Sequence, residues 1–515
     1  MKITSFNFFV FLCVSVILYY CFPKRCRWLL LLAFSLLFFL LASWKVSFYL
    51  LIGLLAAYFG ARFLDDSAKT DRTRRLILVT AIGLLMAVLA LLKYVNIVPN
   101  TVNAFGDLFG LKLGWKSLDL VAPIGISYYT LTLWAYLTDV YRGTVRAERN
   151  PLKLALFTIY YPCLICGPLL RYRDMQTQLF APRSIDWNDL FQGFHRIVYG
   201  LLKKLFVADT LAAYVQIIFS NTARYSGYLI PVGVLLYAIQ IYCDFSGCMD
   251  IVIGASRLYG VRLPENFDAP FLSRTLSEFW RRWHMTLGLW GKDYILYPLL
   301  KSERFQRLGK SARKRFGKKL GKKLPMILAI LILWVYIGIW HGVTYRYIFA
   351  AGILPWIYLS LSELLADPIK RCTEKLRIPT DAPWFHLVQS FRTLLLMLII
   401  WLIVLSPSLH DSVTVFGRIF TAPAPGVAQK LIRDVLRGSL TDAQVYTKYS
   451  LLAISLMGIF VVDRLKYRGV PVGERFNQRP VWFRYLLLFA MLFAVISFGV
   501  YGPGYNPVDF IYGGF

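Results

Sequence analysis

The sequence predicts an all-α polytopic membrane protein. Of its 515 residues, 57% are hydrophobic and 17% are charged, and the mean hydropathy is +0.55, whereas soluble domains are about 45–50% apolar and about 25% charged. The apolar residues also come in blocks that approach the roughly 20 residues needed to cross a bilayer as a helix. These observations exclude a soluble enzyme.

The charge distribution follows a membrane pattern. Lys and Arg number 58 and Asp and Glu 28, which gives a formal net charge of +30. In a soluble chain this excess would suggest nucleic-acid binding, but here the cations lie in short loops between apolar blocks, as in loops kept in the cytoplasm. We therefore expect membrane lipids as partners and no nucleic acid. The eight cysteines are scattered, mostly in apolar stretches, so we expect no disulfide framework.

The N-terminal part predicts five crossings. Apolar blocks lie at 8–20, 28–44, 48–63, 76–92 and 121–140. We interpret the first as a retained helix, because no positive segment beyond Lys2 and no small-residue cleavage site accompany it. Cationic loops after the first, third and fifth blocks place the N-terminus outside the cytoplasm. These cations are Lys24, Arg25, Arg27, Lys69, Arg72, Arg74, Arg75, Arg142, Arg146 and Arg149.

Two blocks in the middle of the chain depart from this pattern. Residues 154–170 have cations on both flanks and contain Pro162, so we expect a re-entrant segment, whose irregular backbone must be satisfied by protein or water. Lys203 and Lys204 interrupt the apolar run 197–219, and we expect that run to lie partly along the cytoplasmic interface.

The next two blocks are also irregular. Residues 229–259 contain Asp244, Gly247 and Asp250, which predict more than one helix. Residues 271–300 mix aromatic, charged and apolar side chains in a way that no plain spanning helix does.

The strongest charge run of the chain occupies 301–323. We favour a cytoplasmic loop beside anionic lipid, with a docking surface for an acidic cytoplasmic carrier protein as the alternative. Its cations are Lys301, Arg304, Arg307, Lys310, Arg313, Lys314, Arg315, Lys318, Lys319, Lys322 and Lys323.

Further apolar blocks complete the helical set, at 324–340, 347–365, 391–405, 449–462 and 485–501. Charge counting places the mixed stretch 407–446 and the C-terminal residues 502–515 outside the cytoplasm. We expect one integral-membrane domain over 1–515, made of N-terminal helices (1–95), a core that holds two unusual histidines (121–365) and C-terminal helices (388–515).

The first of these histidines is His341, which follows an apolar helix directly after Trp340 and before Gly342. Ionisable groups inside a membrane are costly and are functional hypotheses by default. Burial keeps an imidazole neutral, so that it can take a proton from an attacking hydroxyl, and glycine allows close approach. The alternative is a purely structural role, in which the imidazole donates a hydrogen bond to a backbone carbonyl at the helix end.

The second is His284, at the end of the string FWRRWH (279–284). Here a structural interpretation explains more. Arg281 and Arg282 would anchor an interfacial helix to lipid phosphates beside tryptophans at headgroup level. Glu278 would pair with Arg282 four residues later. Only the histidine itself stays unexplained.

Acidic residues and cysteines in apolar segments are assigned to architecture. Asp139, Asp244, Asp250 and Asp293 lack a defined catalytic partner and would pair with Arg142, Arg262 or Lys292. Cys163 and Cys166 have no second cysteine pair or nearby histidine to complete a metal or redox site, so core packing is the better interpretation. We expect no metal site, no Gly-rich phosphate loop and no serine nucleophile elbow.

An ordered set of strings resembles the membrane-bound O-acyltransferases, and specifically their bacterial alginate O-acetylation branch. Any one string is weak, but together they cover most of the chain in family order. They are PIGISYY (123–129), YLTDVYRG (136–143), Gly167-Pro168 with RYRD (171–174), YCDFSGCMD (242–250), PENF (264–267), FWRRWH (279–284), Trp340-His341-Gly342 and Phe510-Ile511-Tyr512.

The resemblance implies a ring of tilted transmembrane helices, with re-entrant and interfacial helices, around a thin core reached from both faces. It implies that His341 is the catalytic histidine and His284 a second family histidine of less defined role. Beside them we assign Trp340, Trp283, Asp244 and Asn266 to substrate binding.

The implied reaction moves an acetyl group from a cytoplasmic thioester, acetyl-CoA or another acyl donor, across a bacterial cell membrane to an exported or cell-surface polysaccharide. No permanently bound cofactor is expected. The implied partners are an extracytoplasmic acetyltransferase and the polysaccharide export machinery. D-alanyl transfer from a carrier protein toward teichoic acid is the alternative within the family. A transporter or flippase is the alternative outside it, but the related broken halves that such a protein would have are not apparent.

Helix length raises a question about depth. His341 lies about 17 residues after Leu324, or roughly 25 Å along a straight helix. A histidine at mid-membrane therefore requires a tilted helix, or one that begins below the bilayer.

Overall fold

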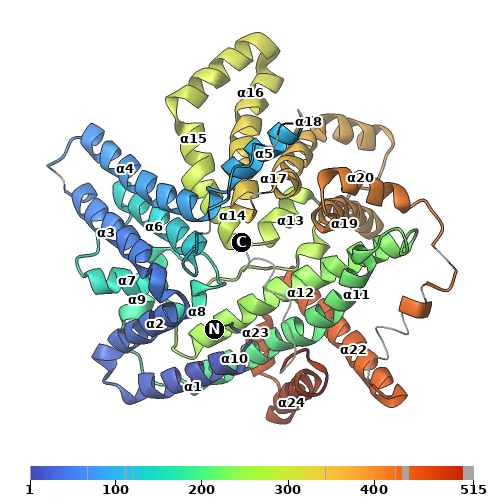
Figure 1. Ribbon diagram of the computed structural model, residues 1–515, viewed down its shortest axis with the longest axis horizontal. Helices are drawn as coiled ribbons and strands as arrows, with labels where there is room; N and C mark the ends of the chain where they lie inside the picture. Colours follow the sequence, from blue (N-terminus) through green and yellow to red (C-terminus); the bar gives the residue numbers. More distant parts are fainter. Residues whose placement is uncertain are drawn as a thin grey trace. The chain divides into compact units, whose positions relative to one another are not determined.

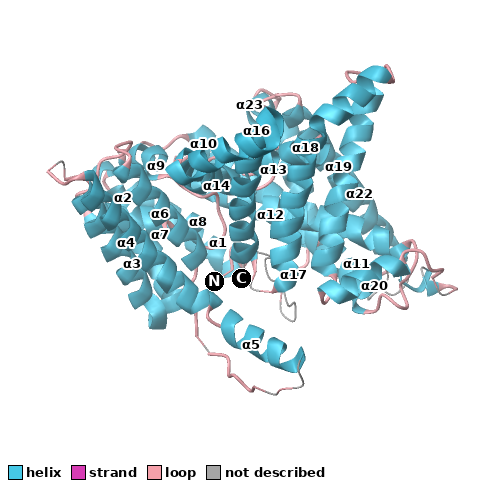
Figure 2. Ribbon diagram, turned by 90° about the horizontal axis from the view of Figure 1, so that it is seen from above, coloured by secondary structure: helices cyan, strands magenta, loops and turns pink. Residues whose placement is uncertain are grey.

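The computed structural model describes residues 2–66, 68–108, 111, 113–118, 120–342, 344–423, 425–427, 429–431 and 440–502. Within these ranges the chain is helical and has no strand, only one isolated bridge between Phe267 and Trp283 (Figure 2). Eight helical segments of the described chain are long and apolar enough to cross a membrane. The prediction of an all-α, multi-pass membrane protein is confirmed.

Backbone contacts divide the chain into two units. The first contains 2–197 and 251–264, and the second contains 198–250 and 265–502. Each is described here by itself.

The first unit begins with helices that match the predicted blocks. Ser5 and Thr70 cap α1 and α4 through their side-chain oxygens, as is typical of helix starts. A Cβ at Gly60 of α3 would lie 3.1 Å from Ala81 Cβ and 3.2 Å from Leu137 Cδ2, so this glycine lets α3 approach α4 and α6 closely (Figure 1). The helices are α1 (Phe6–Cys21), α2 (Arg27–Ser43), α3 (Ser47–Leu64), α4 (Asp71–Leu89), α5 (Ile97–Leu108), α6 (Ile126–Tyr141), α9 (Tyr172–Phe180) and α10 (Trp187–Leu201).

Helix α6 begins five residues later than the predicted block 121–140. Gly125 precedes it with φ 74°, and a Cβ there would lie 2.4 Å from the Leu164 carbonyl oxygen. The left-handed backbone stops a helix from extending further back, and the close approach leaves room only for glycine.

Block 154–170 is broken, as Pro162 predicts. Helix α7 (Pro151–Ile159) ends before Tyr160, whose ψ of 104° is not helical, and a single turn, α8 (Tyr161–Leu164), follows. The break agrees with a re-entrant segment, whose placement in the bilayer stays a prediction.

Helix α12 (Leu229–Arg257) corrects one prediction. It is one continuous helix of 29 residues, so the expectation of more than one helix in 229–259 is wrong. Its two acids are neutralised by lysines of the preceding segment, Asp244 by Lys204 and Asp250 by Lys203. Gly247 permits close contact instead of breaking the helix, because a Cβ there would lie 2.8 Å from the Gly200 carbonyl oxygen.

The run 197–219 is also continuous. It comprises the end of α10, a π-helical segment (Leu202–Ala208) and α11 (Asp209–Ser220). Lys203 and Lys204 are only 4% and 3% exposed. Their burial in ion pairs removes the reason for placing this run along the interface.

Residues 271–300 are broken as predicted. They form α13 (Leu276–Arg282), α14 (Met285–Gly291), a π-helical segment (Lys292–Leu296) and the start of α15 (Tyr297–Lys301). His284 lies between α13 and α14.

The basic run 301–323 is a helical hairpin, not a loop. Helix α16 (Glu303–His341) is interrupted at Gly317, where φ is 77° and ψ 171°. The two arms lie side by side (Figure 1), and a Cβ at Gly321 would meet the Arg313 backbone nitrogen at 2.4 Å. The arm that ends at His341 thus begins at 318, before Leu324 and about 36 Å back along a straight helix. Where this arm begins relative to the bilayer stays a prediction.

The remaining helices of the second unit are α17 (Tyr345–Ile348), α18 (Leu354–Lys375), α19 (Pro383–Leu405), α20 (Leu409–Arg418), α22 (Asp442–Tyr467), α23 (Val472–Asn477) and α24 (Val481–Phe498). Among them, α18, α19, α22 and α24 contain most of the predicted C-terminal blocks, whereas α20 and α23 lie outside those blocks. The predicted Phe510-Ile511-Tyr512 string lies outside the described residues.

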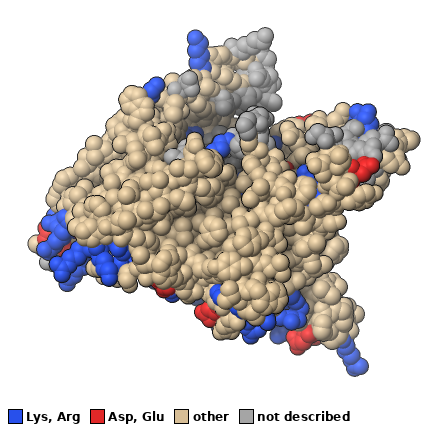
Figure 3. Space-filling view, turned by 90° about the horizontal axis from the view of Figure 1, so that it is seen from below, with Lys and Arg blue, Asp and Glu red and all other residues tan. Residues whose placement is uncertain are grey.

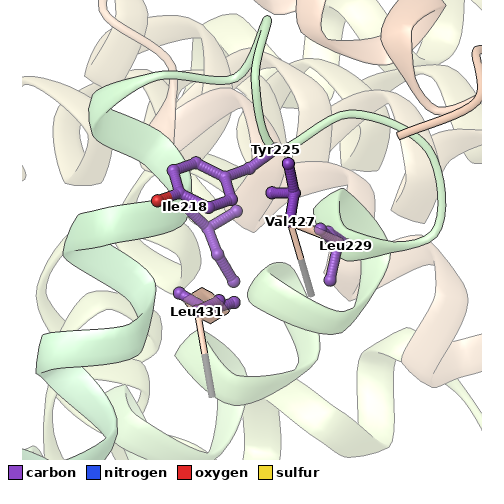
Figure 4. Packing of buried hydrophobic residues seen from close by; sticks show 5 residues of the cluster. All are labelled: Ile218, Tyr225, Leu229, Val427 and Leu431. Atoms are coloured by element: carbon purple, nitrogen blue, oxygen red, sulfur yellow. The ribbon is translucent and has the colours of Figure 1, made fainter. Parts of the chain in front are cut away.

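A buried cluster holds part of the stretch 407–446 against α11 and α12. Val427 and Leu431 pack on Ile218, Tyr225 and Leu229 (Figure 4). These apolar contacts remove surface from water and stabilise the packing of this stretch.

Large apolar side chains are exposed along many of the helices, Phe59 and Phe63 of α3 and Leu486 and Phe489 of α24 among them. On the face drawn in Figure 3, Lys and Arg gather in several clusters, and large parts of the surface carry few charges. Extensive apolar exposure with charges gathered in clusters is expected of a protein whose solvent is lipid.

Candidate active site

The second unit brings the two predicted histidines together. His341 ends α16, and His284 precedes α14. The Trp340 ring is close to both: its centroid lies 6.2 Å from that of the His284 ring and 5.0 Å from that of the His341 ring. His284 is 4% exposed, whereas His341 is partly exposed. The pair forms a compact candidate site in which one imidazole is more accessible than the other.

A short antiparallel pairing holds the His284 backbone. The strings PENF and FWRRWH meet at the bridge between Phe267 and Trp283. The Asp268 amide donates to the Arg282 carbonyl at 3.0 Å. His284 itself has φ 48° and ψ 52°, a left-handed conformation that is uncommon outside glycine.

The Asn266 side chain lies at the centre of this pairing. Its Oδ1 accepts from the amide and the hydroxyl of Thr286 at 3.0 and 2.9 Å. Its backbone carbonyl accepts from the Met285 amide at 3.0 Å. The carboxamide also contacts His284 Nδ1, at 3.2 Å from Nδ2 and 3.3 Å from Oδ1. These contacts engage the side chain within the protein; its predicted role in substrate binding stays a prediction.

Aromatic rings surround His284. The Phe245 ring meets the imidazole edge to face at a centroid distance of 4.8 Å. Trp283 stacks on Phe279 at 5.6 Å and packs against Phe267 at 5.0 Å. Burial among these rings, together with the electrostatic effect of the nearby His341, holds the pKa of His284 well below its ordinary value. The ring is therefore neutral near pH 7.

A buried ion-pair cluster, defined by Lys203, Lys204, Asp209, Asp244 and Asp250, lies in the same unit. Lys204 Nζ is 2.6 Å from Asp244 and 2.8 Å from Asp209, and Lys203 Nζ is 2.5 Å from Asp250. The partners expected for these acids, Arg142, Arg262 and Lys292, are wrong for Asp244 and Asp250. Arg262 instead pairs with Asp189 at 3.3 Å.

Sequence reasoning missed the two lysines of this cluster. A signal was present, since adjacent lysines interrupt one apolar run and two acids interrupt the next. Cations and anions in neighbouring apolar segments can neutralise each other, and buried charges are normally paired. The salt bridge of Asp244 is a structural contact, and its predicted contribution to substrate binding is not tested by it.

The predicted pair of Glu278 and Arg282 is present at 3.0 Å. Arg282 also reaches Asp268 at 2.5 Å. Arg282 therefore ties α13 to the residue that follows the PENF string. This contact within the protein differs from the lipid anchor that the structural interpretation gave to Arg282.

A small pocket in the first unit is lined by other strings that were singled out. Tyr128 and Tyr129 come from PIGISYY, and Pro168 follows Gly167; Phe157 and Tyr160 of the broken block complete part of the wall. The pocket contains no histidine. Within the described ranges, no group of three or more His, Cys, Asp or Glu residues is placed to hold a metal ion.

Residues 145–313 match the model of the membrane-bound O-acyltransferase family. The chain is 31% identical over 450 residues to the probable alginate O-acetylase AlgI of Pseudomonas putida. The matched region covers 86% of this chain and 84% of that protein. The chain belongs to the membrane-bound O-acyltransferase family. It is an O-acyltransferase, as the resemblance implies.

Two further members of the family are also similar. The peptidoglycan O-acetyltransferase of Helicobacter pylori is 27% identical over 66% of this chain and 64% of its own. The teichoic acid D-alanyltransferase of Bacillus subtilis is 28% identical over 45% of this chain and 56% of its own. The O-acetyltransferases thus match more of this O-acyltransferase than the D-alanyltransferase does.

Proposed function

We propose that this O-acyltransferase moves acetyl groups from a cytoplasmic thioester, acetyl-CoA or a related donor, to an exported or cell-surface polysaccharide. The observation that carries the proposal is the similarity to an alginate O-acetylase over 84% of that protein's length. The pairing of His284 and His341 in aromatic surroundings supports it, because acyl transfer to a hydroxyl needs a base in a site that excludes water.

His341 acts as the general base in this proposal. Its imidazole takes the proton of the acceptor hydroxyl while the oxygen attacks the thioester carbonyl. The tetrahedral intermediate then collapses: the carbon–sulfur bond breaks, and the thiolate receives the proton from His341. The products are an O-acetyl ester and a free thiol. The partial exposure of His341 suits a group that must meet substrates.

The cellular setting belongs to the same proposal. The enzyme lies in a bacterial plasma membrane, receives the donor at the cytoplasmic face and delivers acetyl groups outside. Its partners are an extracytoplasmic acetyltransferase and the polysaccharide export machinery. The D-alanyl alternative is supported by the shorter similarity to the teichoic acid enzyme.

Sealed inverted vesicles that contain the enzyme test the proposal. The cytoplasmic face of such vesicles is outermost, so labelled acetyl-CoA added to the medium should transfer label to an acceptor polysaccharide enclosed in the lumen. Right-side-out vesicles should transfer little. Label from a D-alanyl carrier protein but not from acetyl-CoA would favour the alternative, and transfer of neither acyl group would contradict both.

The basic hairpin 301–323 is proposed to contact anionic lipid. Its second arm carries the exposed Lys318, Lys319 and Lys322 beside the exposed apolar side chain of Leu320, whereas Lys323 donates to the Glu363 carbonyl at 2.6 Å. Each cation near an anionic surface contributes about 1 kcal/mol. Replacing the three exposed lysines with glutamine should reduce the anionic lipid that copurifies with the enzyme, measured by mass spectrometry.

The acidic-carrier alternative predicts a different result for the same variant. If a carrier docks there, transfer from carrier-bound donor should fall while transfer from free acetyl-CoA is preserved. Unchanged lipid content in the variant would contradict the lipid interpretation. Replacing Lys370 and Lys375 of α18 with glutamine gives a control for general loss of cations.

A further inference from the structure

The contacts of Asn266 determine how its carboxamide is oriented. The Thr286 backbone amide can only donate, so the atom that faces it at 3.0 Å is the oxygen of the carboxamide. The nitrogen then faces the other way, where Nδ2 donates to Met249 Sδ at 3.3 Å. Since Asn266 is 1% exposed, water does not compete for these atoms. The hydrogen-bond partners therefore distinguish Oδ1 from Nδ2 of Asn266, which the shape of the side chain alone could not do.

The same contacts limit what His284 can do with its Nδ1. A carboxamide oxygen has two lone pairs, and Thr286 occupies both of them through its amide and its hydroxyl. The amide nitrogen has two hydrogens, of which Met249 takes one. His284 Nδ1 lies 3.2 Å from Nδ2 and 3.3 Å from Oδ1. Since Thr286 already occupies both lone pairs of Oδ1, the second hydrogen of Nδ2 is the partner left for Nδ1. Nδ1 must then be an acceptor, and a neutral imidazole with an accepting Nδ1 carries its proton on Nε2.

We propose that Asn266 is a positioning residue that holds His284 as the Nε2–H tautomer, and so makes it a hydrogen-bond donor instead of a base. The two histidines would then have different tasks. His341 accepts a proton, and His284 offers one in a hydrogen bond without transferring it.

The task of His284 rests on the proposed function. In acyl transfer, negative charge develops on the carbonyl oxygen of the thioester as the hydroxyl attacks, and a preorganised donor at that oxygen stabilises the transition state. An Nε2–H held in an aromatic enclosure is such a donor. Burial and the nearby His341 lower the pKa of His284, which supports a neutral ring. Asn266 then decides which of the two ring nitrogens carries the single proton.

Nitrogen-15 NMR of the full-length enzyme, labelled only at its histidines, reads the tautomer directly. The chain has five histidines, and the signals of His284 are those lost in His284→Gln and kept in His410→Ala. We expect a protonated Nε2 and an unprotonated Nδ1 in the wild-type enzyme. A protonated Nδ1, or protonation of both nitrogens, at pH 7 would overturn the proposal without any need for a variant at Asn266.

The Asn266→Asp variant provides the second part of the test. An ionised carboxylate only accepts hydrogen bonds, so the proton of His284 should move to Nδ1. We expect kcat for acetyl transfer to fall about a hundredfold, the typical effect of losing one oxyanion donor, while KM for acetyl-CoA stays within about twofold. A buried carboxyl that is protonated can donate to Nδ1 again, so the activity of the variant relative to that of the wild-type enzyme at the same pH should recover on the acid side of the pH profile.

A merely structural role for Asn266 would give a pH-independent loss and an unchanged tautomer, and that result would also overturn the proposal. Asn188→Asp, the same substitution at an exposed position, should change neither readout. If the wild-type enzyme shows the expected tautomer but transfers no acetyl group, the proposed function fails and the assignment to Asn266 stands.

Discussion

Replacing His341 with alanine is expected to reduce acetyl transfer by about a hundredfold to ten thousandfold, the range over which a general base contributes. The variant retains the aromatic enclosure and His284, but no group at the end of α16 can take the proton of the acceptor hydroxyl. The measurement is the initial rate of label transfer from acetyl-CoA to polysaccharide in inverted vesicles. The loss should appear mainly in kcat, because the imidazole acts on the reacting hydroxyl and not on the donor.

His410→Ala is the matched control. It removes an exposed histidine of α20 in the same unit, and its rate should equal that of the wild-type enzyme. Both variants should insert in the membrane and elute as a single species in detergent. A His341→Ala enzyme that is well folded and transfers acetyl groups at more than about a tenth of the wild-type rate would rule out its role as the base.

Replacing Lys204 with methionine is expected to destabilise the enzyme by about 3–5 kcal/mol, the usual cost of removing one partner from a buried ion pair. Methionine has a length similar to lysine but no charge. The change leaves Asp244 and Asp209 facing each other without the cation that now lies 2.6 and 2.8 Å from them. The midpoint of thermal unfolding in detergent, followed by size-exclusion chromatography, measures the loss.

Two further variants separate charge from packing. Adding Asp244→Asn to Lys204→Met should restore part of the lost stability, because fewer uncompensated charges remain in the interior. Lys370→Met removes the lysine of an exposed pair with Glu374 at 3.9 Å, which should cost less than about 1 kcal/mol. Equal losses from Lys204→Met alone and from the double variant would show that packing, not charge, holds this region.

The spans of the fold could be predicted because their signal is local. The apolar blocks at the N-terminus became helices whose ends lie within about five residues of the block. The C-terminal helices extend further, since α18 ends at Lys375 instead of 365 and α19 begins at Pro383 instead of 391. Where the prediction failed, the cause was tertiary. Asp244, Gly247 and Asp250 look like helix breakers in the sequence, yet Lys203, Lys204 and Gly200 supply the charges and the space that let α12 continue. The lysines that interrupt the preceding apolar run were a signal, but no pattern within 229–259 itself identifies them as the partners.

The candidate site could be predicted in its residues but not in its connections. His284 and His341 were singled out from their neighbours in the sequence, and the structure brings both of them close to the Trp340 ring. The PENF string was quoted only as a resemblance. Asn266 contacts Nδ1 of His284 because two short non-helical segments pair in antiparallel fashion. Such segments show no periodic hydrophobic pattern, so their pairing could not be predicted from the sequence.

The left-handed backbone of His284 has a consequence for evolution and for engineering. A side chain other than glycine in this conformation typically costs about 1–2 kcal/mol, so a chain selected only to fold would be expected to carry glycine or asparagine between α13 and α14. Screens that reward thermostability alone should therefore drift toward losing this imidazole. Selection for a more durable catalyst has to hold position 284 fixed and seek its gains elsewhere.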